Sequence, residues 1–506
     1  MKTKFQLVVV ISLLLATSLA CNTFTNLVSP SETPSSTPTP TRPTLEPTST
    51  FIAPPNPDPG AEGIGDPYFP DLGNGGYDAQ HYSIDLDVDM DANEISGSTT
   101  IDLVATQELT SLNFELLGMS VEQVSVNGQQ AVFNRNGEEL TIYLPQPAAL
   151  NDALQIVIAY SGIPGQGLDS SGLPQYSEGW IRYDKGVVVA GEPTGASTWY
   201  PVNEHPADKA TYSFNLTVPK PYEVAANGVF QGVEENGSQS TYRWEMNDPI
   251  APYLVTVAIA DFDLVEYSSQ SGVPIRNYFA VGVPQSIRDN FAREGDMVDY
   301  FETIFGPYPF DAFGVVVHEM DLAFSLECAT LVVFGDTFTY EYVVAHELSH
   351  MWFGDSVGLE EWKDIWLNEG FATYAQFLWD EHAQGRSVMD QEVRDTYQQI
   401  AMFGQLYPEQ PIGDPGPDNL FSFGVYNRGG VALHALRLEV GDEAFFNILR
   451  TYTERFGGGN AKTADFIALA EEVSGQQLDA FFDAWLYQMD LPDIPQMGLS
   501  AADFAQ

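Results

Sequence analysis

Apolar and polar residues alternate along the first half of the chain in the way that predicts β-strands. From Tyr82 to Met90, apolar side chains alternate with acidic ones, the pattern of a strand with one buried and one solvated face. Asn-Gly pairs recur between such stretches and are typical of tight hairpin turns. We therefore predict an antiparallel β domain over residues 64–265. Further strand candidates are Thr100–Val104, Leu140–Leu144 and Leu154–Tyr160, and the turn candidates are Asn127-Gly128, Asn136-Gly137, Asn227-Gly228 and Asn236-Gly237.

The pattern changes after about residue 265, where helical spacing becomes dominant. A strand is predicted at Pro274–Val281, followed by a helix that Gly306-Pro307-Tyr308-Pro309 would end. The apolar positions of that helix are Phe291, Val298, Phe301, Ile304 and Phe305. Two strands, Phe313–His318 and Leu331–Phe334, precede a mainly helical remainder. We predict an α+β protein whose second domain covers residues 266–495, with a C-terminal tail at 496–506.

The N-terminal residues predict export from the cytoplasm. Lys2 and Lys4 precede a short apolar run, so residues 1–20 are predicted to be a signal peptide. Cys21 follows directly, which favours a lipid-anchored protein at the cell surface. Ser18 departs from the usual aliphatic residue three positions before such a cysteine, so ordinary cleavage and secretion stay an alternative. Residues 21–63 are rich in Ser, Thr and Pro and are predicted to be a disordered tether.

Composition narrows the range of partners. The chain has 70 acidic and only 20 basic residues, a formal net charge of −50. Nucleic acid is disfavoured as a partner because its phosphates would be repelled, whereas cationic groups such as peptide ammonium would be attracted. Membrane contact is expected only through the anchor at Cys21. If Cys21 is lipidated, Cys328 is alone, no intrachain disulfide forms, and Cys328 is expected to be a small buried residue.

The strongest chemical signal is the run His346-Glu347-Leu348-Ser349-His350. Histidines four residues apart on a helix share one face and can reach one metal ion, with Glu347 placed beside it. Catalytic zinc takes three protein ligands, and Glu369 on a second helix fits as the third. Such a run also occurs as an ordinary helix with two core histidines. The added Asn368-Glu369 pair at a fitting distance argues against that alternative.

The chain resembles the alanyl/membrane aminopeptidase family of gluzincin zinc metallopeptidases. The runs His346–Asp355 and Asp364–Tyr374 look like the family's two zinc-ligand helices, and Trp199-Tyr200-Pro201 looks like the signature of its β domain. The resemblance extends from about residue 75 to about residue 492. It implies a β saddle domain followed by a thermolysin-like catalytic domain. It also implies one Zn²⁺ per chain, held by His346, His350 and Glu369.

The resemblance implies a role for each site residue. Glu347 would be the general base for water attack on the peptide bond. Tyr426, in a run similar to the family's Tyr-x-Lys-Gly-Ala motif, would donate a hydrogen bond to the oxyanion. Glu327, and less strongly Glu192, would bind the free ammonium of the substrate. This sequence departs from the family pattern at three positions, which are Phe324 for glycine, Cys328 for asparagine and Ala190 for glutamine.

The function predicted is therefore hydrolysis of the N-terminal peptide bond of extracellular peptides. Two alternatives are a catalytically altered member acting as a peptide-binding scaffold and an epoxide hydrolase on the same zinc site. The remaining histidines lack partners at metal-ligand spacing and are predicted to be structural; they are His81, His205, His318, His382 and His434. The chain ends about twenty residues after Trp485, so we expect a short two-domain, bacterial lipoprotein-like member.

Overall fold

The computed structural model describes residues 60–165, 178–322, 324–406 and 410–504. The predicted signal peptide, Cys21 and nearly all of the predicted tether lie outside the described residues. Within those residues, no helix combines the length and the apolar composition needed to cross a membrane.

The largest sheet in the described part of the chain is built on a long strand, β1 (Tyr77–Asp89). Its alternating pattern buries Ile84, Leu86 and Val88 while the acidic residues between them face outward. The sheet is antiparallel except where β1 lies parallel to β11. This corrects the purely antiparallel prediction, and the cause is the long connection that runs through other strands before returning to β1. In spatial order the strands are β13 (Val229–Asn236), β14 (Gln239–Ile250), β11 (Ala210–Pro219), β1, β2 (Glu94–Ala105), β8 (Ala153–Gly162), β4 (Ser120–Val126) and β5 (Gln129–Gln130).

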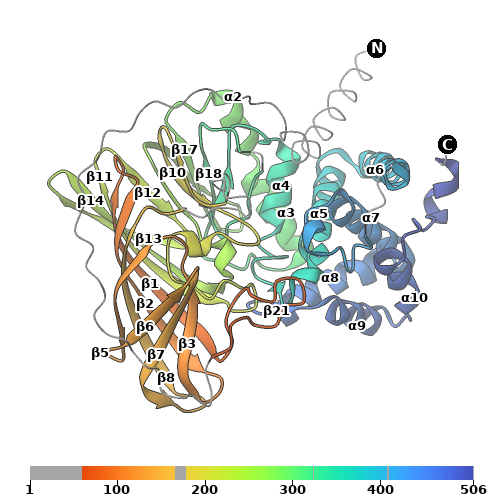
Figure 1. Ribbon diagram of the computed structural model, residues 1–506. Helices are drawn as coiled ribbons and strands as arrows, with labels where there is room; N and C mark the ends of the chain where they lie inside the picture. The colour runs from red at the N-terminus through yellow and green to blue at the C-terminus, as the bar shows by residue number, and fades with distance from the viewer. Residues whose placement is uncertain (1–59, 166–177, 323, 407–409, 505–506) are drawn as a thin grey trace, which may run out of the picture. The chain divides into compact units, whose positions relative to one another are not determined.

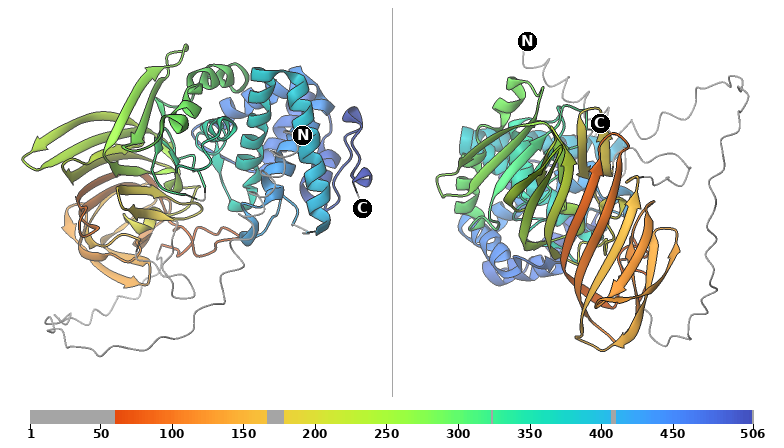
Figure 2. Two further views of the ribbon diagram at one scale, coloured as in Figure 1. Left: turned by 90° about the horizontal axis from the view of Figure 1, so that it is seen from above. Right: turned by 90° about the vertical axis from the view of Figure 1, so that its left-hand side faces the viewer.

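Two smaller sheets complete the β-rich part, and Figure 2 shows its strands side by side from two directions. The turns at Asn127-Gly128, Asn136-Gly137 and Asn236-Gly237 join paired strands, as predicted. The prediction for Asn227-Gly228 is wrong, because the strands on either side pair with other partners. The smaller sheets are β3 (Leu109–Glu115), β7 (Glu139–Ala148), β6 (Val132–Asn136) and β12 (Glu223–Ala226), β15 (Val257–Ala260), β10 (Gly186–Ala190), β9 (Gly179–Tyr183).

The side chain of Asn227 explains that exception. It is fully buried, and its amide donates to the carbonyl oxygens of Leu254 and Ala329 at 2.9 and 2.6 Å. Its Oδ1 accepts a hydrogen bond from the backbone of Thr256 at 2.6 Å. Asn227 therefore satisfies backbone groups of separate segments, one of which follows Glu327, instead of making a local turn.

A mixed sheet opens the second part of the chain. It runs β16 (Phe262–Ser268), β17 (Pro274–Ala280), β18 (Phe313–Val317), β19 (Val332–Phe334), with β18 parallel to both neighbours. The predicted domain boundary at residue 265 falls inside β16, which pairs with β17. The predicted helix is present as α3 (Glu294–Phe305), and Gly306 ends it with a φ of 105°.

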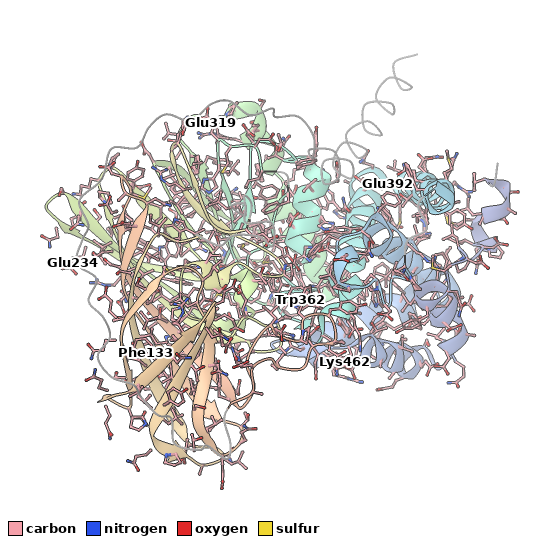
Figure 3. The ribbon with its side chains drawn as sticks, in the orientation of Figure 1. Phe133, Glu234, Glu319, Trp362, Glu392 and Lys462 are labelled. Carbon is pink, nitrogen blue, oxygen red and sulfur yellow. The ribbon has the colours of Figure 1, made fainter. Side chains whose placement is uncertain are left out.

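Helices dominate from residue 341 onward and appear in cyan and blue in Figure 1. Trp362 is fully buried between them and the β-rich part, whereas Glu234 is exposed at the edge (Figure 3). The remaining elements are α2 (Gln285–Arg288), α4 (Glu341–Ser349), β20 (Gly358–Leu359), α5 (Trp366–Gln384), α6 (Arg386–Leu406), α7 (Phe423–Val440), α8 (Asp442–Phe456), β21 (Asn460–Ala461), α9 (Thr463–Ser474) and α10 (Asp479–Phe482).

Candidate active site

The helices α4 and α5 bring the three predicted metal ligands together. His346 lies on α4 and His350 caps its end, with ring centroids 4.9 Å apart. Glu369 lies in the first turn of α5, and its Oε2 is 3.2 Å from Nε2 of His346 and 3.7 Å from Nε2 of His350. One ligand atom from each residue lies within 4.8 Å of the others, and all three residues are buried.

The two imidazoles are held so that both Nε2 atoms face Glu369. Nδ1 of His346 lies 3.2 Å from Oε1 of Gln376, and Nδ1 of His350 lies 3.0 Å from the carbonyl oxygen of Phe353. Because these oxygens accept the Nδ1 protons, the Nε2 atoms are left as metal-binding lone pairs. Burial lowers the pKa of His350 to about 4, which keeps the ring neutral as a ligand must be. The donor set therefore fits one zinc ion.

Tyr426 reaches the site because α5 and α7 touch backbone to backbone. A Cβ on Gly429 would lie only 2.8 Å from Cα of Gly370, so no larger residue fits at this crossing. The close approach places the Tyr426 ring parallel to the ring of His346, with centroids 5.9 Å apart. Burial would raise the pKa of Glu369, but the imidazoles and the Tyr426 hydroxyl outweigh burial and lower it.

Three further carboxylates, Glu347, Glu327 and Glu192, face the same space. Burial and the charge of Glu369 raise the pKa of Glu347 well above its ordinary value. Burial also raises the pKa values of Glu327 and Glu192, and neighbouring carboxylates add to the effect. Oε1 of Glu327 and Oε1 of Glu192 are buried without a hydrogen-bond partner among the described residues. Such groups are costly unless a cation or a hydrogen-bond donor joins them.

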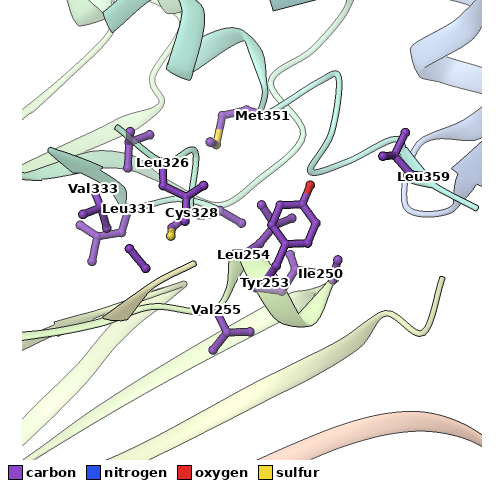
Figure 4. Packing of buried hydrophobic residues seen from close by; sticks show 14 of the residues in the cluster. Ile250, Tyr253, Leu254, Val255, Leu326, Cys328, Leu331, Val333, Met351 and Leu359 are labelled. Carbon is purple, nitrogen blue, oxygen red and sulfur yellow. The ribbon is translucent and has the colours of Figure 1, made fainter. Parts of the chain in front are cut away.

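The segment that carries Glu327 is fixed by apolar packing. Leu326 and Cys328 are buried on either side of it, close to Val333 and Met351 (Figure 4). Leu326 and Val333 exchange backbone hydrogen bonds of 3.0 and 2.8 Å. Cys328 is a free, buried cysteine, as expected. The packing leaves Glu327 itself directed into the pocket.

All seven predicted site residues line one cavity of about 280 Å³. Sequence reasoning missed Gln376, Phe338 and Val343 in its wall. Gln376 lies two helical turns after Glu369, a spacing that could have found it. The other histidines lie in unrelated contacts: His205 with Asp66, His318 with Tyr183, His81 with Thr211 and Ser213, His434 with Tyr374, and His382 against the ring of Tyr300.

Two family models match this chain. Residues 78–254 match the peptidase M1 N-terminal domain, and residues 315–485 match the peptidase family M1 domain. The M1 zinc metallopeptidase from Deinococcus radiodurans has a crystal structure that is 31% identical, with a TM-score of 0.79. The match covers 86% of this chain and 99% of that one.

The chain belongs to peptidase family M1. Human glutamyl aminopeptidase is 30% identical over 334 residues, which cover 60% of this chain and 34% of that protein. Aminopeptidase M1 of Arabidopsis thaliana is 25% identical over 447 residues, which cover 82% of this chain and 50% of that protein. The chain thus spans a third to a half of the length of these curated relatives. A mutant of the Deinococcus radiodurans M1 peptidase has been solved with a Tyr-Ser-Ala substrate.

Membership of the M1 family accounts for both parts of the fold. The β-rich part corresponds to the M1 N-terminal domain, and the helical part carries His346, His350 and Glu369, the candidate zinc ligands. The solved relatives are zinc metallopeptidases, in keeping with a single catalytic zinc.

Proposed function

We propose that this M1 protein is a zinc-dependent aminopeptidase that hydrolyses the N-terminal peptide bond of extracellular peptides. The observation that carries the proposal is the convergence of two groups in one cavity. His346, His350 and Glu369 form a zinc donor set, and the carboxylates of Glu327 and Glu192, each with one buried oxygen that makes no hydrogen bond among the described residues, stand beside it. An enzyme that recognises a free amino terminus needs a negative group in the same cavity as the metal.

The side chains divide the chemistry among them. Bound zinc supplies Lewis acidity, which lowers the pKa of water and polarises a carbonyl group. Glu347 takes the proton of the attacking water and returns it to the leaving amine. The Tyr426 hydroxyl donates a hydrogen bond to the oxygen that becomes negative. Glu327 and Glu192 hold the substrate ammonium and so place the first peptide bond at the reacting centre.

A paired-substrate assay tests this function. A tripeptide with a free amino terminus and its N-acetylated counterpart would be incubated with the zinc-loaded protein, and products identified by mass spectrometry. We expect release of the first residue from the free peptide alone, and no release by Glu347→Gln. Equal cleavage of the acetylated peptide would make the protein an endopeptidase. Binding of both peptides without cleavage would favour a scaffold.

We do not favour the scaffold or the epoxide hydrolase. The five residues assigned to zinc binding, proton transfer and oxyanion stabilisation all line the cavity. The peptidase relatives supply no reason to prefer an epoxide substrate.

We further propose that the protein is exported and anchored to the cell surface by a lipid on Cys21. The support is the sequence alone, in which Cys21 directly follows a signal-peptide pattern. Mass spectrometry of the mature N-terminus should find a lipidated cysteine that is absent from Cys21→Ser. An unmodified N-terminus in the culture medium would instead show secretion.

A further inference from the structure

A lysine of the β-rich part reaches the segment that follows the helix of the candidate zinc ligands. Lys209 directly precedes β11, which is hydrogen-bonded to strands on both sides. Its Nζ donates to the carbonyl oxygens of Asp355, Ser356 and Gly459 at 2.9, 2.9 and 2.8 Å. Three acceptors match the three N–H groups of an ammonium, so all of its donors are used. Lys209 therefore ties a strand of the large sheet to two loops of the second part of the chain.

The segment that Lys209 holds also orients one of the candidate zinc ligands. The backbone N–H of Asp355 donates to the carbonyl oxygen of His350 at 3.0 Å, and the carbonyl oxygen of Phe353 lies 3.0 Å from Nδ1 of His350. Between them, Gly354 has a φ of +127°, and a Cβ there would lie 3.3 Å from the same Nδ1. A shift of this backbone would therefore move the oxygen that holds the imidazole ring.

The end of the Lys209 side chain has little room to move. A Cβ on Gly358 would lie 2.7 Å from Cε and 3.0 Å from Nζ of Lys209, and 2.6 Å from Oδ1 of Asn460. Gly358 lies in β20 without a positive φ, so its backbone accepts alanine and the added methyl group would displace the lysine. Burial lowers the pKa of Lys209 to about 7, although the Asp355 carboxylate raises it, so the ammonium form predominates below that pH.

We propose that Lys209 is a positioning residue for the zinc site, which holds residues 353–356 against His350 and so increases the affinity for zinc. The β-rich part then contributes to the metal site, although the three candidate ligands all lie in the helical part. The inference rests on the zinc donor set and does not depend on the proposed substrate. A partner that orients a metal ligand contributes about 10- to 100-fold to metal affinity, and Lys209 acts one step further out, so we expect about tenfold.

Zinc affinity tests the proposal directly. Competition with a chromogenic chelator at about pH 6.5, below the pKa of Lys209, would give the zinc dissociation constants of wild type and Lys209→Met. Methionine keeps an unbranched side chain and removes the three donors, so zinc should bind about tenfold more weakly. Lys185→Met is the matched control, because this exposed lysine also joins the β-rich part to the second part, through Glu319. The control should bind zinc as tightly as wild type.

Gly358→Ala disturbs the same contact from the other side. It keeps the lysine but places a methyl group where Cε of Lys209 lies, so zinc should again bind more weakly. If this variant acts through Lys209, the double variant should bind zinc no more weakly than Lys209→Met alone. Gly358→Ala decides the question if Lys209→Met does not fold. Wild-type zinc affinity in a folded sample of either variant would overturn the inference, and so would an equal loss in Lys185→Met.

A spectrum separates the orientation of His350 from general loosening of the fold. Cobalt(II) in place of zinc gives visible absorption bands that depend on the geometry of its ligands. The bands of Lys209→Met should differ from those of wild type and Lys185→Met, and identical bands in all three would overturn the inference. None of these measurements uses peptide turnover. A wild type that gave the expected metal results but cleaved no peptide would reject the proposed function and leave the inference standing.

Discussion

Two groups of buried charges in this protein are treated in opposite ways. In the active-site cavity, Glu192 and Glu327 each keep a buried carboxylate oxygen without a hydrogen-bond partner among the described residues. At the start of the described chain, Asp66 accepts hydrogen bonds from the backbone of Tyr68, Phe69 and Trp362 and also pairs with His205. A buried oxygen without a hydrogen bond destabilises the folded protein, whereas the hydrogen bonds to Asp66 stabilise it.

This difference separates structure from function. The Asp66 carboxylate ties a segment near residue 66 to Trp362, which lies almost three hundred residues later in the chain. Oε1 of Glu327 and Oε1 of Glu192 make no hydrogen bond to another described segment, so we infer that these oxygens are satisfied when a substrate cation binds. Folded proteins break the rule of paired buried charges at functional sites and compensate elsewhere. The predictions below first change the zinc ligands and catalytic side chains around the pocket carboxylates, and then one member of each group.

The largest effect is expected at the zinc ligands. His350→Ala removes one of three donors, and zinc content should fall from one per chain to well below half, with activity lost. The control is His382→Ala, because that histidine is exposed and stacks on Tyr300 outside the cavity. Inductively coupled plasma mass spectrometry of the purified proteins measures zinc. Equal zinc content in the two variants would show that His350 is not a zinc ligand.

The next largest effect is expected at Glu347 and Tyr426, whose loss should lower the catalytic rate without loss of zinc. Glu347→Gln and Tyr426→Phe should each lower kcat by about 10² to 10⁴, because a general base or an oxyanion donor contributes that much. Both variants should keep their zinc, since neither side chain is a ligand in the proposed site. Near-normal turnover by either variant would show that its assigned role is wrong.

A smaller effect is expected at the ammonium-binding carboxylates. Glu327→Ala should lower kcat/KM for free amino termini by about 10- to 100-fold, through both kcat and KM, because ammonium binding positions the scissile bond. The control is Glu360→Ala, a carboxylate whose side chain is about half exposed. An equal loss of kcat/KM in the control would assign the effect to the change in overall negative charge instead of to ammonium binding.

Glu327→Gln sharpens the comparison further. Oε1 of Glu327 makes no hydrogen bond among the described residues, so exchanging the carboxylate for an amide should not lower the Tm of the metal-free protein. A clear drop in Tm would show that Glu327 is part of the folding framework, like Asp66.

Local pattern predicted much of this molecule. The alternation in β1, the helical spacing in α3 and the spacing of His346 and His350 each depend on neighbouring residues, and the structure has all three. The parallel pairing of β1 with β11 and the burial of Asn227 were not predicted, because distant segments decide them. Phe338 lines the cavity and has a φ of +56°, and neither feature carries a sequence signal. Tyr426, Glu327 and Glu192 came from the family resemblance, since no local rule singles out one tyrosine or glutamate.

The smallest effect, and the other half of the comparison, concerns Asp66. Burial would raise the pKa of this carboxyl, but hydrogen bonds from His205 and three backbone N–H groups lower it from 3.8 to about 2. A lowered folded pKa means that the stabilisation is complete above about pH 4 and is lost as the pH falls through about 2.

Asp66→Asn should therefore lower the free energy of unfolding by about 1–3 kcal/mol at pH 6, where the charged hydrogen bonds are intact. Urea unfolding of wild type and variant across pH 2–7 measures the difference, which should shrink below pH 4. Asp71→Asn, an exposed neighbour, should show no such difference. If the free energies of unfolding of Asp66→Asn and wild type differed by the same amount down to pH 2, packing rather than the Asp66 charge would hold this segment to Trp362.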